Sequence, residues 1–140
     1  MKGSFTLKSN MYFHHHGLAV KNPDRSRKAL EYLGYHLGEI VYDPIQKVYV
    51  QLADKANTPR IELVWAGDEA SPIDRWIKSQ NQSLYHTCYE VDDLSTCVEE
   101  LRDLGKVMPL GPAVPAVLFD QRLIQFLYVE GLGLIELLQR

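Results

Sequence analysis

Two histidines and two glutamates recur in the same order along this chain of 140 residues. His15 is followed 47 positions later by Glu62, and His86 is followed 50 positions later by Glu136. Both glutamates stand in an identical Ile-Glu-Leu triplet, and the offsets between the two pairs are 71 and 74 positions. Because an internal duplication explains this repetition more simply than chance does, we expect two similar halves that share one site.

These four side chains have the chemistry of metal ligands. Imidazole nitrogens and carboxylate oxygens bind divalent ions such as Zn, Ni, Co, Mn and Fe, and a six-coordinate ion would keep two positions for water or substrate oxygens. Taken singly, a strand glutamate usually faces solvent and a strand histidine is usually a hydrogen-bonded structural residue. The paired recurrence favours the metal. The predicted ligands of one divalent first-row ion, whose identity the sequence leaves open, are His15, Glu62, His86 and Glu136.

Strand geometry explains how the four side chains could meet, because alternate residues of a strand lie on opposite faces. In the strand expected at residues 11–20, His15 shares a face with Gly17 and Ala19, whose small side chains leave room in front of the sheet. His14 and His16 should lie on the other face, under the helix that follows. In both triplets the aliphatic neighbours claim the core face, so each glutamate should project to the opposite side.

The elements that position these residues are predicted as a βαβββ unit that occurs twice. The expected elements of the first unit are a strand at 11–20, a helix at 23–33, and strands at 36–42, 47–52 and 60–65. Those of the second unit are a strand at 84–91, a helix at 93–104, and strands at 106–109, 123–129 and 134–138. Both helices follow a capping Asn or Asp and end at a glycine. A short helix should open at Ser71 and Pro72, and the proline-containing stretch 111–121 should form a loop that borders a cleft.

The two long helices should pack on the convex side of the sheet, away from the metal. The residues expected to face inward are Ala29, Leu30 and Leu33 in the first helix, and Leu94, Cys97, Val98, Leu101 and Leu104 in the second. The order of elements predicts an α+β fold, with residues 1–140 forming a single domain. A module at 12–66 and a module at 83–139, joined by a linker with a short helix at 67–82, should curl into a half-open, barrel-like cleft.

Composition excludes several classes of protein. The apolar share of 46% and the charged share of 24% are those of a globular chain, so disorder is not the main state. A formal net charge of −3 argues against binding to nucleic acid through phosphate neutralisation. No apolar stretch is long enough for a membrane span, and residues 1–10 lack the apolar segment of a secretory signal. The two cysteines, Cys88 and Cys97, match no disulfide framework or zinc motif, so we expect a cytoplasmic protein.

Four stretches of the chain resemble the vicinal oxygen chelate (glyoxalase/bleomycin resistance/dioxygenase) superfamily, which includes glyoxalase I and the extradiol dioxygenases. Within it they are most similar to methylmalonyl-CoA epimerases. The stretches are HHHGLAV at 14–20, IEL at 61–63 with SPI at 71–73, LYH at 84–86 with VDDL at 91–94, and GLIEL at 133–137. Together they span residues 12 to 139, and ordered motifs from both halves agree.

The resemblance implies that His15, Glu62, His86 and Glu136 occupy the metal positions. It also implies two differences from the epimerases. The epimerase base, a carboxylate on the third strand, would fall at Tyr49, and a tyrosine is a poor base at neutral pH. The glycine-rich stretch before the seventh strand is replaced by PAVPA at 112–116, so the rim of the substrate site differs.

The function that these observations predict is a metal-dependent isomerase or lyase. It would hold vicinal oxygens of a small substrate, for which an acyl-CoA thioester is the candidate, on the ion and stabilise an enolate. Glu136 is the expected proton acceptor, and Tyr49, Gln51 and Gln125 are expected to orient the substrate. Two alternatives stay open: a non-catalytic small-molecule binding protein of the drug-sequestering type, and an Fe(II) dioxygenase, against which the fourth ligand argues. A homodimer is a candidate assembly.

Overall fold

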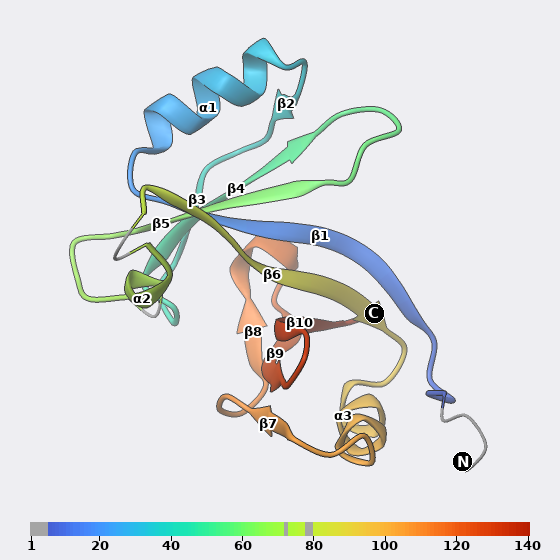
Figure 1. The fold of residues 1–140 in the computed structure, drawn as a ribbon. Coiled ribbons are helices and arrows are strands. Elements are labelled where there is room, and N and C mark those ends of the chain that lie inside the picture. The colour runs from blue at the N-terminus through green and yellow to red at the C-terminus, as the bar shows by residue number, and fades with distance from the viewer. Residues whose placement is uncertain (1–5, 72, 78–79) are drawn as a thin grey trace.

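A single ten-stranded sheet carries the candidate ligands (Figure 1). The computed structural model describes residues 6–71, 73–77 and 80–140, so Pro72, the expected first residue of the short helix, lies outside the described residues. The strands are β1 (Met11–Val20), β2 (His36–Leu37), β3 (Val41–Asp43), β4 (Val48–Asp54), β5 (Ile61–Ala66), β6 (Gln82–Val91), β7 (Val107–Pro109), β8 (Val114–Ala116), β9 (Arg122–Val129) and β10 (Gly133–Gln139). The helices are α1 (Pro23–Tyr32), α2 (Asp74–Ile77), α3 (Leu94–Arg102) and the short 3₁₀ helix η1 (Val117–Phe119).

The sheet has an internal pseudo-symmetry. Its main strand order is β2-β4-β5-β1-β6-β10-β9-β7, with β3 beside β4 and β8 beside β9. On one side β1 pairs parallel with β5 and β5 antiparallel with β4; on the other, β6 pairs parallel with β10 and β10 antiparallel with β9. The antiparallel pair of β1 and β6 joins the two sides. The sheet does not close, and the predicted α+β class with a half-open, glyoxalase-like architecture is confirmed.

Most predicted elements are present, with two differences. The strand expected at 36–42 is divided into β2 and β3, and the amide of Gly38 between them donates to the carbonyl of Leu52. The expected loop at 111–121 contains β8 and η1. Pro115 fits within β8 because this strand pairs only with β9, and a proline at an edge loses no ladder hydrogen bond. Across the described ranges, no helix has the length and hydropathy of a membrane span.

The helix α1 touches the sheet through a narrow stripe. Asn22 caps it, with its side-chain oxygen accepting from the amide of Arg25 at 3.2 Å. Leu30 is buried in a cluster whose other members come from the sheet. The prediction that Ala29 and Leu33 also face inward is wrong, since both are exposed. Leu33 is the residue that follows the last helical turn, where the chain leaves toward β2.

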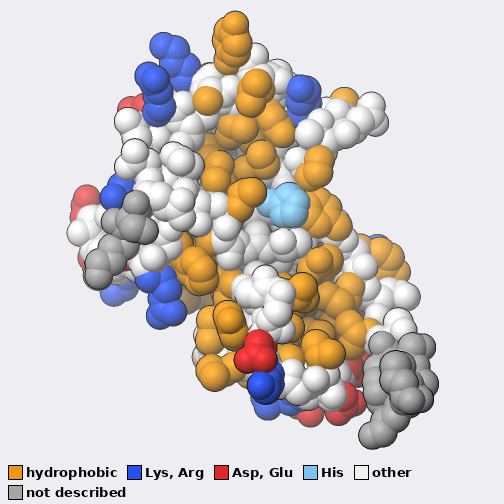
Figure 2. Space-filling view, viewed as in Figure 1, with side chains coloured by type: hydrophobic (Ala, Val, Ile, Leu, Met, Phe, Trp, Pro, Cys, Tyr) orange, Lys and Arg blue, Asp and Glu red, His pale blue; other side chains and the backbone are white. Residues whose placement is uncertain are grey.

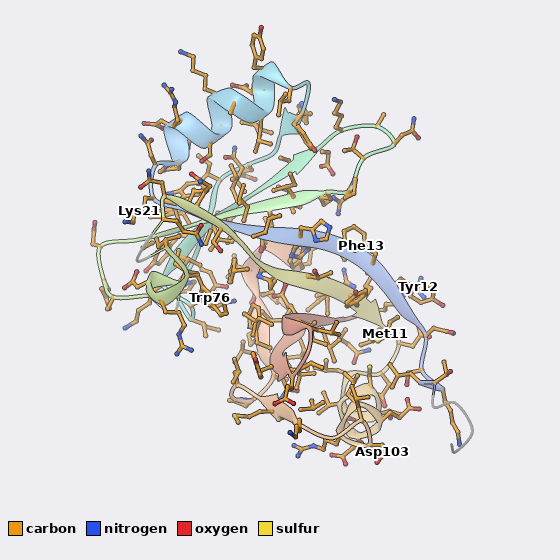
Figure 3. The ribbon with its side chains drawn as sticks, in the orientation of Figure 1. Met11, Tyr12, Phe13, Lys21, Trp76 and Asp103 are labelled. Carbon is orange, nitrogen blue, oxygen red and sulfur yellow. The ribbon has the colours of Figure 1, made fainter. Side chains whose placement is uncertain are left out.

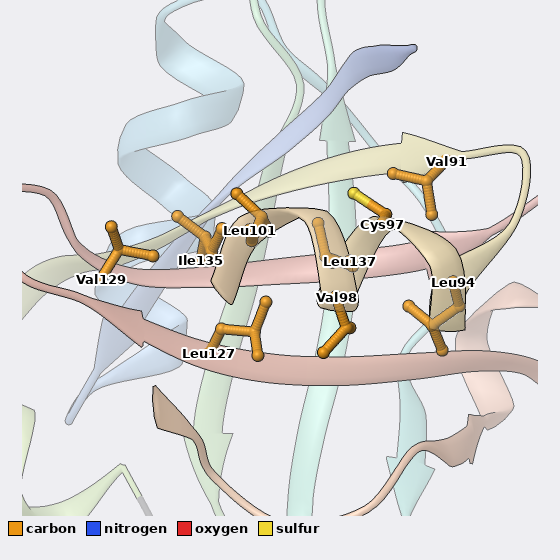
Figure 4. Close-up of a cluster of buried hydrophobic side chains, with 9 residues drawn as sticks. All are labelled: Val91, Leu94, Cys97, Val98, Leu101, Leu127, Val129, Ile135 and Leu137. Carbon is orange, nitrogen blue, oxygen red and sulfur yellow. The ribbon is translucent and has the colours of Figure 1, made fainter. Parts of the chain in front are cut away.

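The helix α3 packs across the strands of the second half (Figure 4). Its buried residues are Leu94, Cys97, Val98 and Leu101, which meet aliphatic residues of β6, β9 and β10 in one cluster. Leu104, also expected inside, is 64% exposed because the helix ends at Arg102 and the chain then turns away. The cluster contains Ile135 and Leu137, so the aliphatic neighbours of Glu136 claim the helix-facing side of β10, as predicted.

This packing predicts a clear contrast between two leucines. Leu101→Ala should lower the free energy of unfolding by about 2–5 kcal/mol, because it leaves a cavity in the cluster under α3. Leu104→Ala, three residues further on and exposed, should change it by less than about 0.5 kcal/mol. Urea titrations of both variants would measure the difference. Loss of bound metal in folded Leu101→Ala, without loss of stability, would mean that the two faces of the sheet are assigned the wrong way round.

Candidate metal centre

The four predicted ligands come from the four adjacent strands at the middle of the sheet. His15 lies on β1, Glu62 on β5, His86 on β6 and Glu136 on β10, and all four are almost completely buried. Their side chains converge, with one ligand atom from each residue within 4.8 Å of those of the others. The strand faces that were expected to point toward one another therefore do so.

A glycine on β1 makes the convergence sterically feasible. A Cβ atom at Gly17 would lie 2.1 to 2.6 Å from atoms of the His86 ring, closer than any side chain tolerates. The imidazole of His86 therefore lies against bare backbone. The expectation that small residues beside His15 leave room in front of the sheet is confirmed at this position.

The spacing of the ligand atoms is that of donors around one ion. His15 Nε2 lies 3.4 Å from Glu62 Oε1 and 3.3 Å from Glu136 Oε1. His86 Nε2 lies 3.6 Å and 3.2 Å from the same oxygens. The two ring nitrogens are 3.2 Å apart. Four donors placed tetrahedrally at about 2.0–2.2 Å from a common ion are separated by about 3.3–3.6 Å, so the residues fit a divalent cation.

Unpaired polar atoms at the same point support this fit. Glu136 Oε1 is buried without a hydrogen-bond partner among the described residues, although it lies between two imidazoles. Buried carboxylate oxygens are normally hydrogen-bonded, because an unpaired one loses its hydration without compensation. A cation at the common point would compensate both carboxylates and use the nitrogen lone pairs of both rings.

In the absence of a metal, a proton on His15 compensates part of the charge of these carboxylates. Burial alone would lower the pKa of His15, but the carboxylates of Glu62 and Glu136 outweigh it and raise the pKa to about 10. Burial alone would raise the pKa of Glu136, but His86 and His15 lower it below its ordinary value. The metal-free centre is therefore a network of ion pairs in which His15 carries a proton at neutral pH.

The raised pKa of His15 predicts how the metal-free protein responds to alkali. The pKa of His15 is about 10 in the folded chain against an ordinary value of 6.5, so the stabilisation that its proton provides is complete below pH 6.5. This stabilisation is lost as the pH rises through about 10. Thermal unfolding of chelator-treated protein should thus show a falling midpoint between about pH 7 and 10. His15→Gln should flatten that fall; an equal fall in the variant and the parent would contradict the assignment.

A β-bulge places His14 beside the centre, which sequence reasoning missed. Phe13 pairs with Tyr89 and His15 with Cys88, so His14 is an extra residue on β1 and the alternation of faces breaks there. The prediction that His14 lies under the helix is therefore wrong. Its Nδ1 lies 2.8 Å from the Nδ1 of His15. Burial and the charge of His15 lower the pKa of His14 to about 4, so a neutral His14 can accept the His15 Nδ1 proton and leave Nε2 facing the centre.

A second group of donors, His14, His15 and Cys88, also lies close together. Burial raises the pKa of the Cys88 thiol, and the nearby carboxylates of Glu136 and Glu62 raise it further. Because the thiolate is the form that binds metal, this thiol is a poor ligand at neutral pH. The group with two carboxylates is the better metal centre.

Two of the predicted substrate-binding residues lie on the wrong face of the sheet. Tyr49 pairs with Trp65 and Gln51 with Leu63, so both point to the α1 side, opposite to Glu62. The Tyr49 ring stacks on Trp65 at 5.9 Å, and Gln51 donates to the carbonyl of Gly38 at 2.8 Å. The prediction that they border the metal is wrong. The residues of β4 that face the centre are aliphatic, which a search for polar groups could not detect.

Gln125 has an indirect position. It pairs with Leu137, whose side chain faces α3, so by register it lies on the face opposite to Glu136. Its amide nonetheless donates to the carbonyl of Gly111 at 2.9 Å, and the residue forms part of a cavity wall. Gln125 therefore holds the loop at 110–112 against the cavity and is not placed beside the ligands.

A small pocket of about 20 Å³ borders the centre. It is lined by the ligands Glu62 and Glu136, and by Tyr85, Phe126 and Asp43. Asp43 is buried, but its two oxygens accept hydrogen bonds from the amides of Ile45 and Gln46 and from the side chain of Gln46. Asp43 thus closes the turn between β3 and β4, and among the described carboxylates that line this pocket Glu136 is the one with an oxygen that lacks a hydrogen-bond partner.

Comparisons with known proteins agree with this architecture. A profile of the Glyoxalase/Bleomycin resistance protein/Dioxygenase superfamily matches residues 14–121. A curated protein of Cereibacter sphaeroides, ethylmalonyl-CoA/methylmalonyl-CoA epimerase, is 30% identical over 128 residues, covering 87% of this chain and 94% of that protein.

Solved structures share the fold at lower sequence identity. Methylmalonyl-CoA epimerase from Mycobacterium tuberculosis is 22% identical, with a TM-score of 0.80 over 96% of this chain and 92% of that chain. The Streptomyces coelicolor methylmalonyl-CoA epimerase in complex with 2-nitronate-propionyl-CoA is 19% identical, with a TM-score of 0.76 over 93% of this chain and 98% of that one.

Proposed function

This chain belongs to the Glyoxalase/Bleomycin resistance protein/Dioxygenase superfamily, and from that premise we propose that it is a metal-dependent isomerase or lyase acting on an acyl-CoA thioester. The observation that carries the proposal is the convergence of two imidazoles and two carboxylates, one of whose oxygens is buried without a hydrogen-bond partner in the described part of the chain. The Cereibacter relative, an epimerase of acyl-CoA compounds, supports the substrate class.

A divalent ion held by His15, Glu62, His86 and Glu136 would act as a Lewis acid toward a substrate carbonyl oxygen. Neighbouring residues of the chain fix the positions of these side chains. The hydrogen bond between His14 and His15 fixes the ring of His15, and the bare backbone at Gly17 seats the ring of His86. The aromatic rings of Tyr85 and Phe126 lie 4.4 Å and 5.2 Å from that of His86 and exclude water from this side.

Proton transfer beside the carbonyl needs a base within hydrogen-bond reach. We assign this role to Glu136, a carboxylate ligand that borders the inner end of the pocket and that would loosen from the ion to accept the proton. Burial raises the pKa of the Tyr85 hydroxyl, and the charges of Glu62 and Glu136 raise it further. That hydroxyl therefore stays protonated and can donate a hydrogen bond to a substrate oxygen.

A non-catalytic small-molecule binding protein is the second candidate. The observation that favours it is the apolar inner face of β4, where Val48 and Val50 stand in place of an acid–base group. An Fe(II) dioxygenase is disfavoured, since it needs only three protein ligands and the fourth convergent ligand would occupy a position that dioxygen needs.

Deuterium exchange separates these functions. Metal-loaded protein incubated with an acyl-CoA in deuterated water should incorporate deuterium at the carbon beside the thioester carbonyl, and chelator-treated protein should not. Mass spectrometry of the recovered acyl-CoA measures the incorporation. Tight binding of acyl-CoA without any exchange would support the binding protein. Equal exchange with and without metal would contradict the proposed function.

A further inference from the structure

A space of about 380 Å³ lies next to the small pocket at the metal centre. The two spaces share walls at Tyr85, Ile124, Phe126 and Gln46, so they are neighbours. At about 30 Å³ for each water-sized group, it has room for about a dozen non-hydrogen atoms. This is far more than a one-carbon branch of an acyl group would fill.

The wall of this space is apolar and partly aromatic. Ile73, Trp76, Tyr85, Phe126 and Leu134 contribute side chains from both halves of the sheet and from the segment around α2. The rings of Trp76 and Tyr85 lie 6.0 Å apart. Figure 3 labels Trp76 beside α2, and Figure 2 shows hydrophobic side chains spread over the face of the molecule seen in Figure 1.

Few polar groups of the wall are available to a ligand. The amide nitrogen of Gln46 donates to Asp43, and that of Gln125 donates to Gly111. Arg75 lies at the exposed rim of the cavity. An interior of this kind favours hydrocarbon and penalises amide groups that would lose hydration without new partners.

We propose that this space receives the acyl group of the substrate, so that the chain selects thioesters with an apolar acyl chain of several carbons. This inference rests on the proposed function, because the thioester carbonyl must lie at the centre for the acyl group to reach the space. The other flexible part of an acyl-CoA, the pantetheine arm, carries two amides, for which the largely apolar wall offers few partners. The acyl group is therefore the better occupant, and the arm runs toward the rim at Arg75.

Affinity as a function of acyl length tests the proposal. Isothermal titration of Co²⁺-loaded protein with acetyl-, butyryl-, hexanoyl- and octanoyl-CoA should show Kd falling by about fourfold for each added methylene. A separate titration with free CoA measures the affinity that the arm alone contributes, which is common to all four acyl-CoAs. A Kd that does not change with acyl length would overturn the proposal.

A matched pair of variants tests the location of the bound chain. Leu134→Phe should fill part of the cavity and move the acyl length of tightest binding to a shorter chain, with unchanged affinity for Co²⁺ and for free CoA. Leu132→Phe, in the turn before β10 and 76% exposed, should leave the length dependence as it is. An identical length profile in all three proteins would place the acyl chain elsewhere and contradict the proposal.

These outcomes separate the inference from the proposed function. Deuterium exchange with a flat length profile would keep the function and remove the inference about the cavity. A steep length profile that Leu134→Phe shortens, without exchange on any acyl-CoA, would support the cavity as the acyl site and remove the catalytic function.

Discussion

Replacing His15 with alanine should weaken metal binding by about 10²–10³-fold. Structural zinc sites bind with about 10–16 kcal/mol, and an equal share among four ligands is about 2.5–4 kcal/mol each, which corresponds to this loss. Removal of His15 also leaves Glu62 and Glu136 without the group that lies 3.4 Å and 3.3 Å from their oxygens. Competition against a chromophoric chelator would measure the affinity.

His16→Ala is the matched control for this prediction. It lies in the same run of three histidines, is only half-buried, and has its Nδ1 3.4 Å from the Thr87 hydroxyl, away from the centre. Its metal affinity should stay within a few-fold of the parent. Circular dichroism of both variants would check that they fold. Equal losses in the two variants, or none in His15→Ala, would contradict the assignment of the ligands.

Glu136→Gln should reduce deuterium exchange into acyl-CoA by about 10²–10⁴-fold, the usual contribution of a positioned general base. The amide keeps the shape of the side chain and one oxygen for the metal but cannot accept the proton. Exchange is therefore measured at metal concentrations that saturate the variant, with occupancy determined on the same sample.

Two further variants distinguish a base from a ligand. Glu62→Gln changes the other carboxylate of the centre, and once it is saturated with metal it should exchange at least ten times faster than Glu136→Gln. Tyr49→Phe should exchange at the parental rate, because its ring stacks on Trp65 on the far side of the sheet. Parental exchange in metal-saturated Glu136→Gln would exclude Glu136 as the base.

Local patterns were sufficient to predict much of the fold and which four side chains converge. The Ile-Glu-Leu triplets could be interpreted because aliphatic residues on both sides of a glutamate leave only one direction for the carboxylate. The small residue at Gly17 was a signal of the same kind, since the His86 ring occupies the space that its Cβ would take. The cap candidates Asn22 and Asp93 placed the starts of both helices within one residue, although in the structure only the side chain of Asn22, of these two, makes a capping hydrogen bond.

What the sequence did not reveal depends on pairing between distant strands. His14 on β1 and Tyr85 on β6 have no partner on the opposite strand, which is evident only once the register of the two strands is known. No local pattern therefore predicts where the alternation of faces breaks. Tyr49 was expected at the substrate site because the resemblance places the epimerase base there, and Gln51 because it is a polar residue on the same face of the strand. In the folded chain the inner face of β4 is the apolar one, so polarity indicated the wrong side.

A short helix was expected to open at Ser71, and α2 begins three residues later, but no sequence signal indicated how this helix packs. Its four residues form too short a helix for a periodic pattern, and its Trp76 belongs to the wall of the cavity only through tertiary packing. Leu33 and Leu104 fit the helical period but lie just beyond the last turns, where the chain changes direction. Periodicity alone does not say where a helix leaves its sheet.

Anomalous diffraction from crystals soaked in a first-row metal tests the central claim most directly. We expect one strong peak at the absorption edge of that metal, about 2.0–2.3 Å from His15 Nε2, His86 Nε2, Glu62 Oε1 and Glu136 Oε1. A peak on His14 and Cys88 instead, or none between the four side chains at saturating metal, would contradict it.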